Sequence, residues 1–586
     1  MTSVDDLFKK PGLPSSSNKR KFETPDAQAA YKATKLSSSS SPNGTSTNGA
    51  TVEDADEDED LEAGPELPPD DDGDDEDGRF FGSGVTKDAE EALDYLDDQD
   101  EEGYKEEVID SAWLRRLATS FEKKVNKNAE LRARYEGDPA KFMDSEADLD
   151  AEVKSWSLLS EHPELYEEFA ESSSVPNLVG LLAHENTDIA IGAIEIIAEL
   201  LDEDVEAGPE QWSAVTKALL DSDLMELLMS NLARLDEQNE SDRSGVYHSL
   251  SVMENLASQP AVAEQMGQEK VLLWLCNRAK RAEKPTGQNK QYAAEVLQVL
   301  LQSSPALRRK LAEDLDGVDL FLQLLATYRK RDPAKDSHEE EWSENLFDAL
   351  TCVVDEPEGK TKFVDAEGVE LCLIMLKEGT KNISHRALRV LDHAVGGHGE
   401  AAASVCLKVV DAAGLKTLFS IFMKKADSAN TEHLLGIFAA LLRLLPGPSS
   451  ERIRTLAKFR EKDYATVSKL VQLRKDYGRK VASVDKEIAR ERATLSEDEI
   501  EERADEWFSL RLNGGLFCLQ TIGVILAWLV AEEPAVKARI LNVSGNEQEL
   551  DAIQASLEEQ RAGLEGGSAE DEDTREMLET LINFLD

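Results

Sequence analysis

Apolar residues recur along the middle of the chain in runs of the form V-x-x-L-x-x-L-L. Such runs begin at Val175, Leu224, Val271, Val318, Val369 and Leu415, at intervals of 49, 47, 47, 51 and 46 residues. Gly317, Gly368 and Gly414 stand directly before three of the runs, where a helix start or a turn is expected. The near-constant interval indicates a repeated structural unit.

A second and longer apolar pattern follows each run after a polar loop. It covers 188–201, 243–258, 289–302, 339–354, 384–395 and 430–445, and apolar residues recur there at three- and four-residue spacing. This spacing predicts amphipathic helices with one buried face. A period in the forties with two or three helices is typical of armadillo and HEAT repeats. We therefore predict an all-α, armadillo/HEAT-type superhelical solenoid.

The same patterns divide the chain into five predicted regions. They are a disordered arm with a basic cluster and an acidic run (1–105), an N-terminal helical cap (106–172), the repeats (173–446), long and final apolar helices (447–545), and a linker with a terminal amphipathic helix (546–586). Helices are expected over 111–134, 146–171, 506–530 and 574–585, and the charged range 451–492 predicts one or two long helices.

Residues 515–531 form an uncharged stretch of 17 residues. A membrane span usually needs about 20 residues, and Gln520 interrupts this one, so we expect a buried helix of the solenoid and no membrane contact. The first ten residues contain no apolar stretch, so no signal peptide is expected.

Charge is distributed unevenly along the 586 residues, which carry a formal net charge of -54. By residue count, 1–52 carries +3, 53–110 carries -25 and 111–586 carries -32. An acidic surface repels nucleic-acid phosphates, whose binding depends on Lys and Arg. It attracts basic partners instead, so direct nucleic-acid binding is not expected.

The residues that usually carry chemistry show no recognisable arrangement. Cys276, Cys352, Cys372, Cys406 and Cys518 are odd in number and form no CxxC pair, which predicts buried free thiols in a reducing compartment. Phosphate-binding loops, HExxH and a GxSxG elbow are absent, and His393, His398 and Cys406 lack a suitably spaced fourth metal ligand. We expect no enzyme activity, catalytic residue, metal or cofactor.

Short basic clusters occur in two settings. Lys19, Arg20 and Lys21 lie in the polar arm and predict a nuclear-import signal, although a chance solvated cluster is the alternative. Thr24 and Ser41 each precede a proline and are candidate phosphorylation sites. The clusters 278–281, 308–310, 329–331 and 424–425 are interpreted as solubilising cations near helix ends.

The longer helix of each unit carries the candidate binding residues. In armadillo proteins this helix lines the groove, and a common frame places there Glu195, Glu199, Glu254, Asn255, Glu295, Trp342, Glu344, Asn345, Asp348 and Asp392. Carboxylates with nearby Trp and Asn side chains can grip an extended Lys/Arg-rich peptide. The alternative is that they are ordinary exposed residues of an acidic protein.

Several longer strings resemble the beta-catenin-like protein 1 family. They lie at 141–149 (KFMDSEADL), 232–237 (LARLDE), 344–350 (ENLFDAL), 389–394 (RVLDHA), 414–424 (GLKTLFSIFMK) and 510–520 (LRLNGGLFCLQ). The resemblance implies a nuclear armadillo protein of the spliceosome. It also implies partners among splicing factors with basic nuclear-localisation segments, including the nineteen complex and its Myb-like subunit.

The favoured hypothesis is therefore a non-enzymatic adaptor of pre-mRNA splicing that binds basic segments in an acidic groove. A nuclear-import adaptor of importin-alpha type would also bind basic peptides, but only Trp342 and Asn345 approach the Trp/Asn array expected for it. A cytoplasmic catenin-like scaffold would need a basic groove. A homodimer is left open by the sequence.

Overall fold

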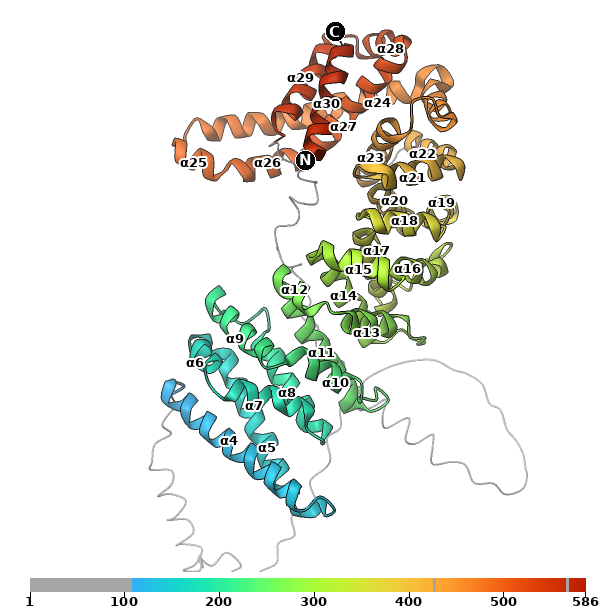
Figure 1. The fold of residues 1–586 in the computed structure, drawn as a ribbon. Helices are drawn as coiled ribbons and strands as arrows, with labels where there is room; N and C mark the ends of the chain where they lie inside the picture. Colours follow the sequence, from blue (N-terminus) through green and yellow to red (C-terminus); the bar gives the residue numbers. More distant parts are fainter. Residues whose placement is uncertain (1–107, 425–427, 547, 565–568, 586) are drawn as a thin grey trace, which may run out of the picture. The chain divides into compact units, whose positions relative to one another are not determined.

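The computed structural model describes residues 108–424, 428–546, 548–564 and 569–585 (Figure 1). The chain divides into two units, residues 20–113 and the remainder, and nearly all described residues belong to the second. The predicted arm, with its import signal Lys19–Lys21 and its phosphorylation sites Thr24 and Ser41, lies outside the described residues.

Within the described ranges every regular element is helical, and units of three helices repeat between residues 166 and 444. The first helices are α6 (Tyr166–Ala170), α9 (Pro209–Asp221), α12 (Pro260–Met266), α15 (Pro305–Asp314), α18 (Pro357–Asp365) and α21 (Gly399–Asp411). The second helices are α7 (Ser174–Gly180), α10 (Leu224–Leu232), α13 (Glu269–Lys280), α16 (Gly317–Leu325), α19 (Gly368–Glu378) and α22 (Gly414–Met423), with 3-10 turns η4 (Leu181–Ala183) and η5 (Ala326–Tyr328) after α7 and α16. The third helices are α8 (Thr187–Leu200), α11 (Glu240–Ala257), α14 (Gln288–Ser303), α17 (His338–Val353), α20 (Lys381–Val395) and α23 (Ser428–Leu444).

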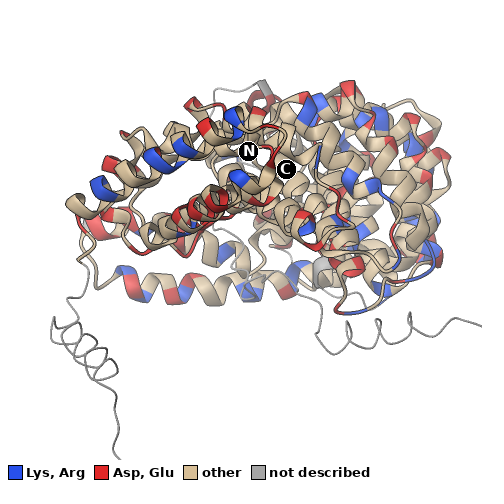
Figure 2. Cartoon of the chain, turned by 90° about the horizontal axis from the view of Figure 1, so that it is seen from below, with Lys and Arg blue, Asp and Glu red and all other residues tan. Residues whose placement is uncertain are grey.

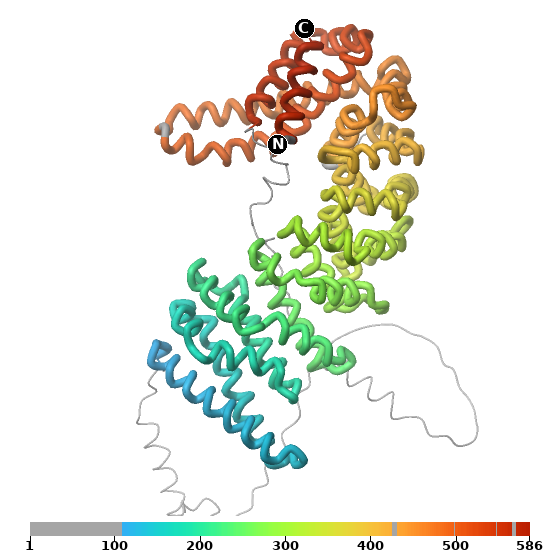
Figure 3. The backbone as a smooth tube through the Cα atoms, in the orientation of Figure 1, coloured from blue at the N-terminus to red at the C-terminus, as the bar shows by residue number. Residues whose placement is uncertain are grey.

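Successive units pack by placing like helices side by side. Each third helix contacts the next, from α8 through α11, α14, α17 and α20 to α23, and first helices α15, α18 and α21 do the same. Figure 3 follows this order along the chain. The predicted all-helical armadillo solenoid is confirmed, and the ranges expected for the longer helices match the third helices.

The first helix of each unit is the element that the apolar pattern left unresolved. Four of these helices begin with a proline, namely Pro209, Pro260, Pro305 and Pro357. Proline suits the first helical position because its fixed φ is helical and its missing N–H has no partner there anyway. These prolines were a sequence signal for a third helix per unit.

The three glycines before the apolar runs are the first residues of α16, α19 and α22, in agreement with the expected helix starts. The left-handed backbone falls on the preceding residues Asp316, Glu367 and Ala413, with φ of 48°, 58° and 59°. A Cβ on Gly317 would lie 2.4 Å from Leu311, and one on Gly368 would lie 2.3 Å from Phe363. Glycine is therefore needed for close packing of the second helix on the first.

The N-terminal cap precedes the repeats. Helix α4 (Ser111–Arg134) has the predicted bounds. The helical region expected over 146–171 is divided into several elements, namely α5 (Met143–Lys154), 3-10 turns η2 (Ser155–Glu161) and η3 (Pro163–Leu165), and then α6. Pro163 cannot donate an intrahelical hydrogen bond, so it ends the helical run. Trp156 is fully buried there, 5.6 Å from Phe121 and 5.1 Å from Phe169 between ring centroids.

The C-terminal part contains α24 (Ser450–Arg492), α25 (Glu497–Glu502), α26 (Ala504–Asn513), α27 (Leu516–Glu532), α28 (Pro534–Ser544), α29 (Glu549–Ala562) and α30 (Ala569–Leu585). Residues 461–464 of α24 leave the helical conformation, so the long charged range forms two helical segments. Helix α30 contacts α27 and α29, which shows that the terminal amphipathic helix packs back onto the fold.

The uncharged stretch 515–531 forms α27, as predicted for a buried helix. It contacts α23, α24, α28, α29 and α30, and most of its side chains are buried. Among the described helices none is by itself both long and apolar enough for a bilayer, although α26 and α27, joined at a 65° bend, reach that length and composition as a pair.

Buried cations donate hydrogen bonds to backbone carbonyls at the C-terminal ends of several third helices. Arg308 of α15 donates to the carbonyls of Leu301 (2.7 Å) and Gln302 (3.1 Å) at the end of α14. Lys360 of α18 donates to Val354 O (2.8 Å) after α17. Arg452 of α24 does the same for Leu442 (2.7 Å) of α23 and for Leu445 (2.9 Å), which directly follows α23.

These three cations are 2–5% exposed. The cluster 308–310, interpreted from the sequence as solubilising, thus includes a core residue. Arg308 lies in the first turn of α15 and donates to carbonyls that have no hydrogen-bond partner within α14.

The cysteines are free and Cys276, Cys372, Cys406 and Cys518 are buried, as predicted, while Cys352 is half-buried. Burial raises the pKa of Cys276 to about 12 and that of Cys352 to about 11. Because the thiolate is the reactive form, these thiols are inert at neutral pH.

Candidate functional site

All ten candidate peptide-binding residues lie on third helices. Glu195 and Glu199 are on α8, Glu254 and Asn255 on α11, Glu295 on α14, Trp342, Glu344, Asn345 and Asp348 on α17, and Asp392 on α20. All except Trp342 are half-buried. Because the third helices pack side by side, these residues form one series along consecutive units.

The first part of the series has polar atoms without partners. The Oε2 atom of Glu199 and the Nδ2 atom of Asn255 are buried, and neither has a hydrogen-bond partner among the described residues. The Glu195 side chain is 47% exposed, and its Oε1 atom lies 3.8 Å from Nε2 of His248. Burial lowers the pKa of His248, so this imidazole is neutral at neutral pH.

The carboxylates in the middle of the series accept hydrogen bonds from uncharged side chains. The Tyr292 hydroxyl donates to Glu254 at 2.6 Å, and the Gln291 amide donates to Glu295 at 3.0 Å. Tyr292 belongs to α14, so its bond joins two adjacent third helices. These contacts hold Glu254 and Glu295 in position.

The last part of the series is paired with basic side chains of the next third helix. Glu344 forms an ion pair with Arg386, and Nη1 of Arg389 lies 2.9 Å from Oδ1 of Asp348. Asp392 lies 3.0 Å from Nδ1 of His433. Arg386 and Arg389 are on α20 and therefore bring two positive charges to the same surface as the carboxylates.

Trp342 differs from the expectation of an exposed binding residue. It is 5% exposed, its Nε1 donates to the carbonyl of Ala279 at 3.2 Å, and Lys290 Nζ lies 4.3 Å from its ring centroid. A buried indole with its donor used has no surface for a ligand. Trp342 is a core residue that links α17 to α13 and α14, whereas its neighbour Asn345 remains half-buried.

Charge of both signs is distributed over the described helices (Figure 2). Several basic side chains outside the series are already paired. Arg278 lies 2.7 Å from Glu237 and 3.0 Å from Glu283, and Arg281 lies 3.1 Å from Glu237. The cluster 278–281 therefore includes two arginines that form ion pairs within the fold.

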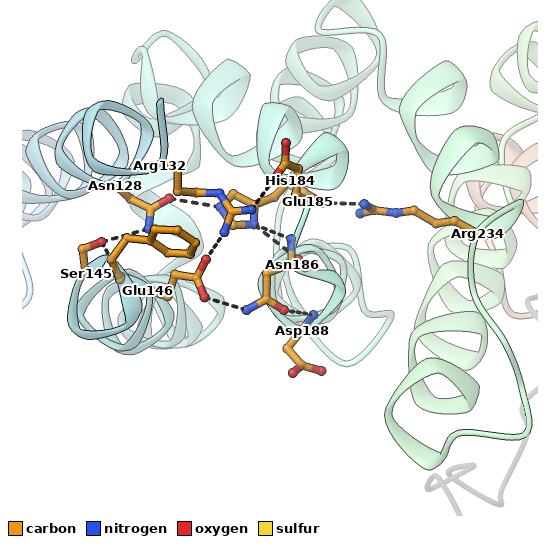
Figure 4. Close-up of polar contacts among 10 residues, drawn as sticks. Asn128, Arg132, Ser145, Glu146, His184, Glu185, Asn186, Asp188 and Arg234 are labelled. Carbon is orange, nitrogen blue, oxygen red and sulfur yellow. Dashed lines mark hydrogen bonds and ion pairs between the residues drawn. The ribbon is translucent and has the colours of Figure 1, made fainter. Parts of the chain in front are cut away.

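A cavity of about 410 Å³ lies where the N-terminal cap meets the first repeat. Figure 4 shows its polar network. Asn128 donates to Ser145 at 3.1 Å and its Oδ1 lies 3.1 Å from Nε2 of His184, while Arg132 pairs with Glu146 and Glu185. Burial lowers the pKa of His184. The polar groups bind one another, so the network holds the cap against the repeat.

No group of three or more His, Cys, Asp or Glu side chains in the described ranges is arranged to hold a metal ion. His393 Nδ1 lies 3.6 Å from Asp355, and burial raises the pKa of Cys406 to about 12. His393 and Cys406 therefore take part in pairing and packing within the fold and do not form a metal site.

A sequence profile of a family described as "Catenin-beta-like, Arm-motif containing nuclear" matches residues 90–558. The chain belongs to the catenin-beta-like (CTNNBL) family. The beta-catenin-like protein 1 homolog of Schizosaccharomyces pombe is 36% identical over 503 residues, which are 85% of this chain and 87% of the relative. Human beta-catenin-like protein 1 is 36% identical over 460 residues, 75% of this chain and 80% of the relative.

Solved structures resemble this CTNNBL chain more distantly. An engineered protein is 15% identical, with a TM-score of 0.46, and covers 78% of this chain and 99% of its own. A designed armadillo repeat protein in complex with the peptide (KR)4 is 14% identical, with a TM-score of 0.36, and covers 46% of this chain and 100% of its own. Likenesses this distant carry no argument about binding.

Sequence reasoning missed the basic partners of the series in this CTNNBL member. Arg386, Arg389 and His433 lie 41 or 42 positions from the carboxylates that they contact. The repeat period itself was the available signal, because residues one period apart on third helices become neighbours. His248, 53 positions from Glu195, follows the same rule.

Proposed function

We propose that this chain is a nuclear, non-enzymatic adaptor associated with pre-mRNA splicing. In this proposal it binds Lys/Arg-rich, nuclear-localisation-type segments of splicing factors through the third helices. The nuclear description of the CTNNBL family and the net charge of -54 support it. The partners implied by the family resemblance are splicing factors such as those of the nineteen complex, including its Myb-like subunit.

The observation that carries the proposal is the pair of buried polar atoms on α8 and α11. Glu199 Oε2 and Asn255 Nδ2 have no hydrogen-bond partner among the described residues. Leaving a buried polar group unbonded costs about 1–3 kcal/mol, more when it is charged. Both side chains are half-buried, so a rotation that turned these atoms toward a ligand with donors and acceptors would remove this cost.

An extended basic peptide has that combination. Its Lys or Arg side chains donate to Glu199 and Glu195, and its backbone carbonyls accept from the Asn255 amide. Glu254 and Glu295 continue the acidic series on the following helices. We therefore place the principal contacts on α8, α11 and α14.

The two alternative functions fit the structure less well. An importin-alpha-type adaptor requires exposed tryptophans, and Trp342 is buried. A catenin-like cytoplasmic scaffold would need a basic groove, whereas the series contains carboxylates on every third helix from α8 to α20. The description of the family as nuclear also opposes the scaffold.

Calorimetric titration of the full chain tests the proposal. The ligand is a peptide with a Lys/Arg cluster, and the matched control peptide has Gln at those positions. We expect a dissociation constant of about 1–100 μM that weakens roughly tenfold between about 50 and 500 mM salt, because exposed charges are screened. Equal affinity for the Gln peptide, or binding insensitive to salt, would contradict charge-based recognition.

A further inference from the structure

A helical hairpin connects the first part of α24 to α27 (Figures 1 and 3). It consists of the end of α24, the short helix α25 and helix α26. Helix α25 packs mainly on α26, and α26 packs on α24 and α27. Trp507 Nε1 donates to Glu491 at 3.0 Å, and Arg511 Nε lies 2.9 Å from Asp485. Trp507 and Arg511 thus form the face of α26 directed at α24.

The neighbouring face of α26 carries an apolar pair that the fold leaves uncovered. Phe508 is 39% exposed and Leu512, four residues later, is half-buried. Asp505 precedes Phe508 by three residues, so the three side chains share one face. The opposite flank carries Glu506 and Leu510, also four residues apart, with Leu510 43% exposed.

Acidic side chains lie close in sequence to this apolar pair, on α25 and at the start of α26. Asp498, Glu501, Glu502 and Asp505 are exposed, and their carboxylates have no ion-pair or hydrogen-bond partner among the described residues. Arg503, which lies among them, is paired with Glu491 of α24. The four carboxylates therefore keep their charge, and that of Asp505 is on the same face as Phe508 and Leu512.

We propose that the face formed by Asp505, Phe508 and Leu512 is a docking surface for a basic amphipathic helix of a partner protein. The apolar side of that helix covers Phe508 and Leu512, and its Lys or Arg side chains contact Asp505 and Glu501. This surface is separate from the third helices, so the inference does not depend on the proposed function.

The geometry favours a helix as the occupant. A short helix gains most of its stability from packing an apolar face against a neighbour. Helices α25 and α26 have six and ten residues. A third helix laid along α26 converts the hairpin into a three-helix arrangement and buries the exposed aromatic ring, the kind of residue that dominates binding energy at interfaces.

The charge decides which helix fits. A second copy of this chain would bring the same carboxylates against one another, and like charges oppose that contact. Nucleic acid is repelled for the same reason. A cationic partner helix is attracted by the four unpaired carboxylates Asp498, Glu501, Glu502 and Asp505.

The test uses the full chain and an 18-residue helical peptide with leucines along one face and lysines on both flanks. A peptide with glutamates in place of the lysines is the control. Fluorescence anisotropy of the labelled peptide measures affinity. We expect the double variant Phe508→Ala, Asp505→Lys to bind about tenfold more weakly than the unchanged chain.

The matched variant Leu510→Ala, Glu506→Lys alters the same kinds of group on the opposite flank of α26, and we expect less than about a twofold change. Thermal unfolding monitored by circular dichroism verifies that both variants fold. Equal loss in the two variants, equal binding of the glutamate peptide, or dimerisation of the chain that Phe508→Ala abolishes would overturn the proposal. Glu199→Lys leaves this binding unchanged if the two surfaces are independent, which separates failure here from failure of the proposed function.

Discussion

The two ends of the third-helix series contain the same kinds of residue in opposite electrostatic settings. On α8, Glu195 is half exposed and Glu199 has a buried oxygen with no partner among the described residues. On α17, Glu344 and Asp348 are paired with Arg386 and Arg389 of the next third helix. The first pair is available to an external cation, whereas the second already has internal ones.

This difference shows that counting carboxylates on a helix does not measure its attraction for a basic ligand. Arg386 and Arg389 neutralise nearby charge and occupy the positions that peptide cations would take. A ligand that displaced these two arginines would lose about as much interaction free energy as it gained. Binding should therefore concentrate where the internal partner is neutral, as with His248 beside Glu195.

The largest effect is expected from reversing charge at the two ends separately. Glu195→Lys with Glu199→Lys should weaken binding of a Lys/Arg peptide by about 30-fold, equivalent to about 2 kcal/mol. Glu344→Lys with Asp348→Lys should change it by less than about threefold, since those carboxylates are already neutralised. Calorimetry on the full chain measures both, and equal losses would abolish the distinction between the two ends.

A smaller effect, in the opposite direction, is expected from removing the internal cations. Arg386→Gln with Arg389→Gln frees Glu344 and Asp348, so affinity for the basic peptide should rise about three- to tenfold. Arg281→Gln is the control, because it removes one charge outside the series. An unchanged or lower affinity in the double variant would mean that the second end takes no part in binding even when unpaired.

The smallest effect concerns pH. Burial lowers the pKa of His248 below its ordinary value of 6.5, so the ring gains its proton only under acidic conditions. The protonated ring lies beside Glu195 and competes with peptide cations, and affinity should fall about two- to threefold between about pH 7.5 and 5.5. His248→Gln should flatten that profile, and a profile unchanged in this variant would assign the pH dependence to another group.

His248 also contributes to the free energy of unfolding, and the direction in which this contribution changes with pH is defined. Because the unfolded chain protonates His248 near 6.5 and the folded chain only at lower pH, the contribution is present above 6.5 and is lost as pH falls through the folded pKa. Urea unfolding at several pH values distinguishes this loss from the loss of binding.

The fold was largely predictable because its signals are local. The range 243–258 predicted from apolar spacing corresponds to α11, Glu240–Ala257. The first helices were harder to predict because several of them are short, and the clearest marks of four of them are single prolines such as Pro305. The division of the chain into five regions stays a prediction, since its first region lies outside the described residues.

The site was less predictable because its properties depend on contacts between units. Trp342 follows Glu339, Glu340 and Glu341, which suggests an exposed helix start, yet its ring packs against α13 and α14. Arg386 has no local feature that marks it as the partner of Glu344. Aligning the third helices by their period would have placed these two side chains together, whereas composition alone could not.

The buried cations at the ends of the third helices have a practical consequence for dividing this protein. Arg308 and Lys360 belong to the unit that follows the helix whose end they bind, and Arg452 belongs to α24, which follows the last unit. A fragment cut directly after a third helix would expose those carbonyls and lose a buried side chain. Stable truncations should run one short helix further, so that the last complete unit keeps the terminus that its neighbour normally supplies.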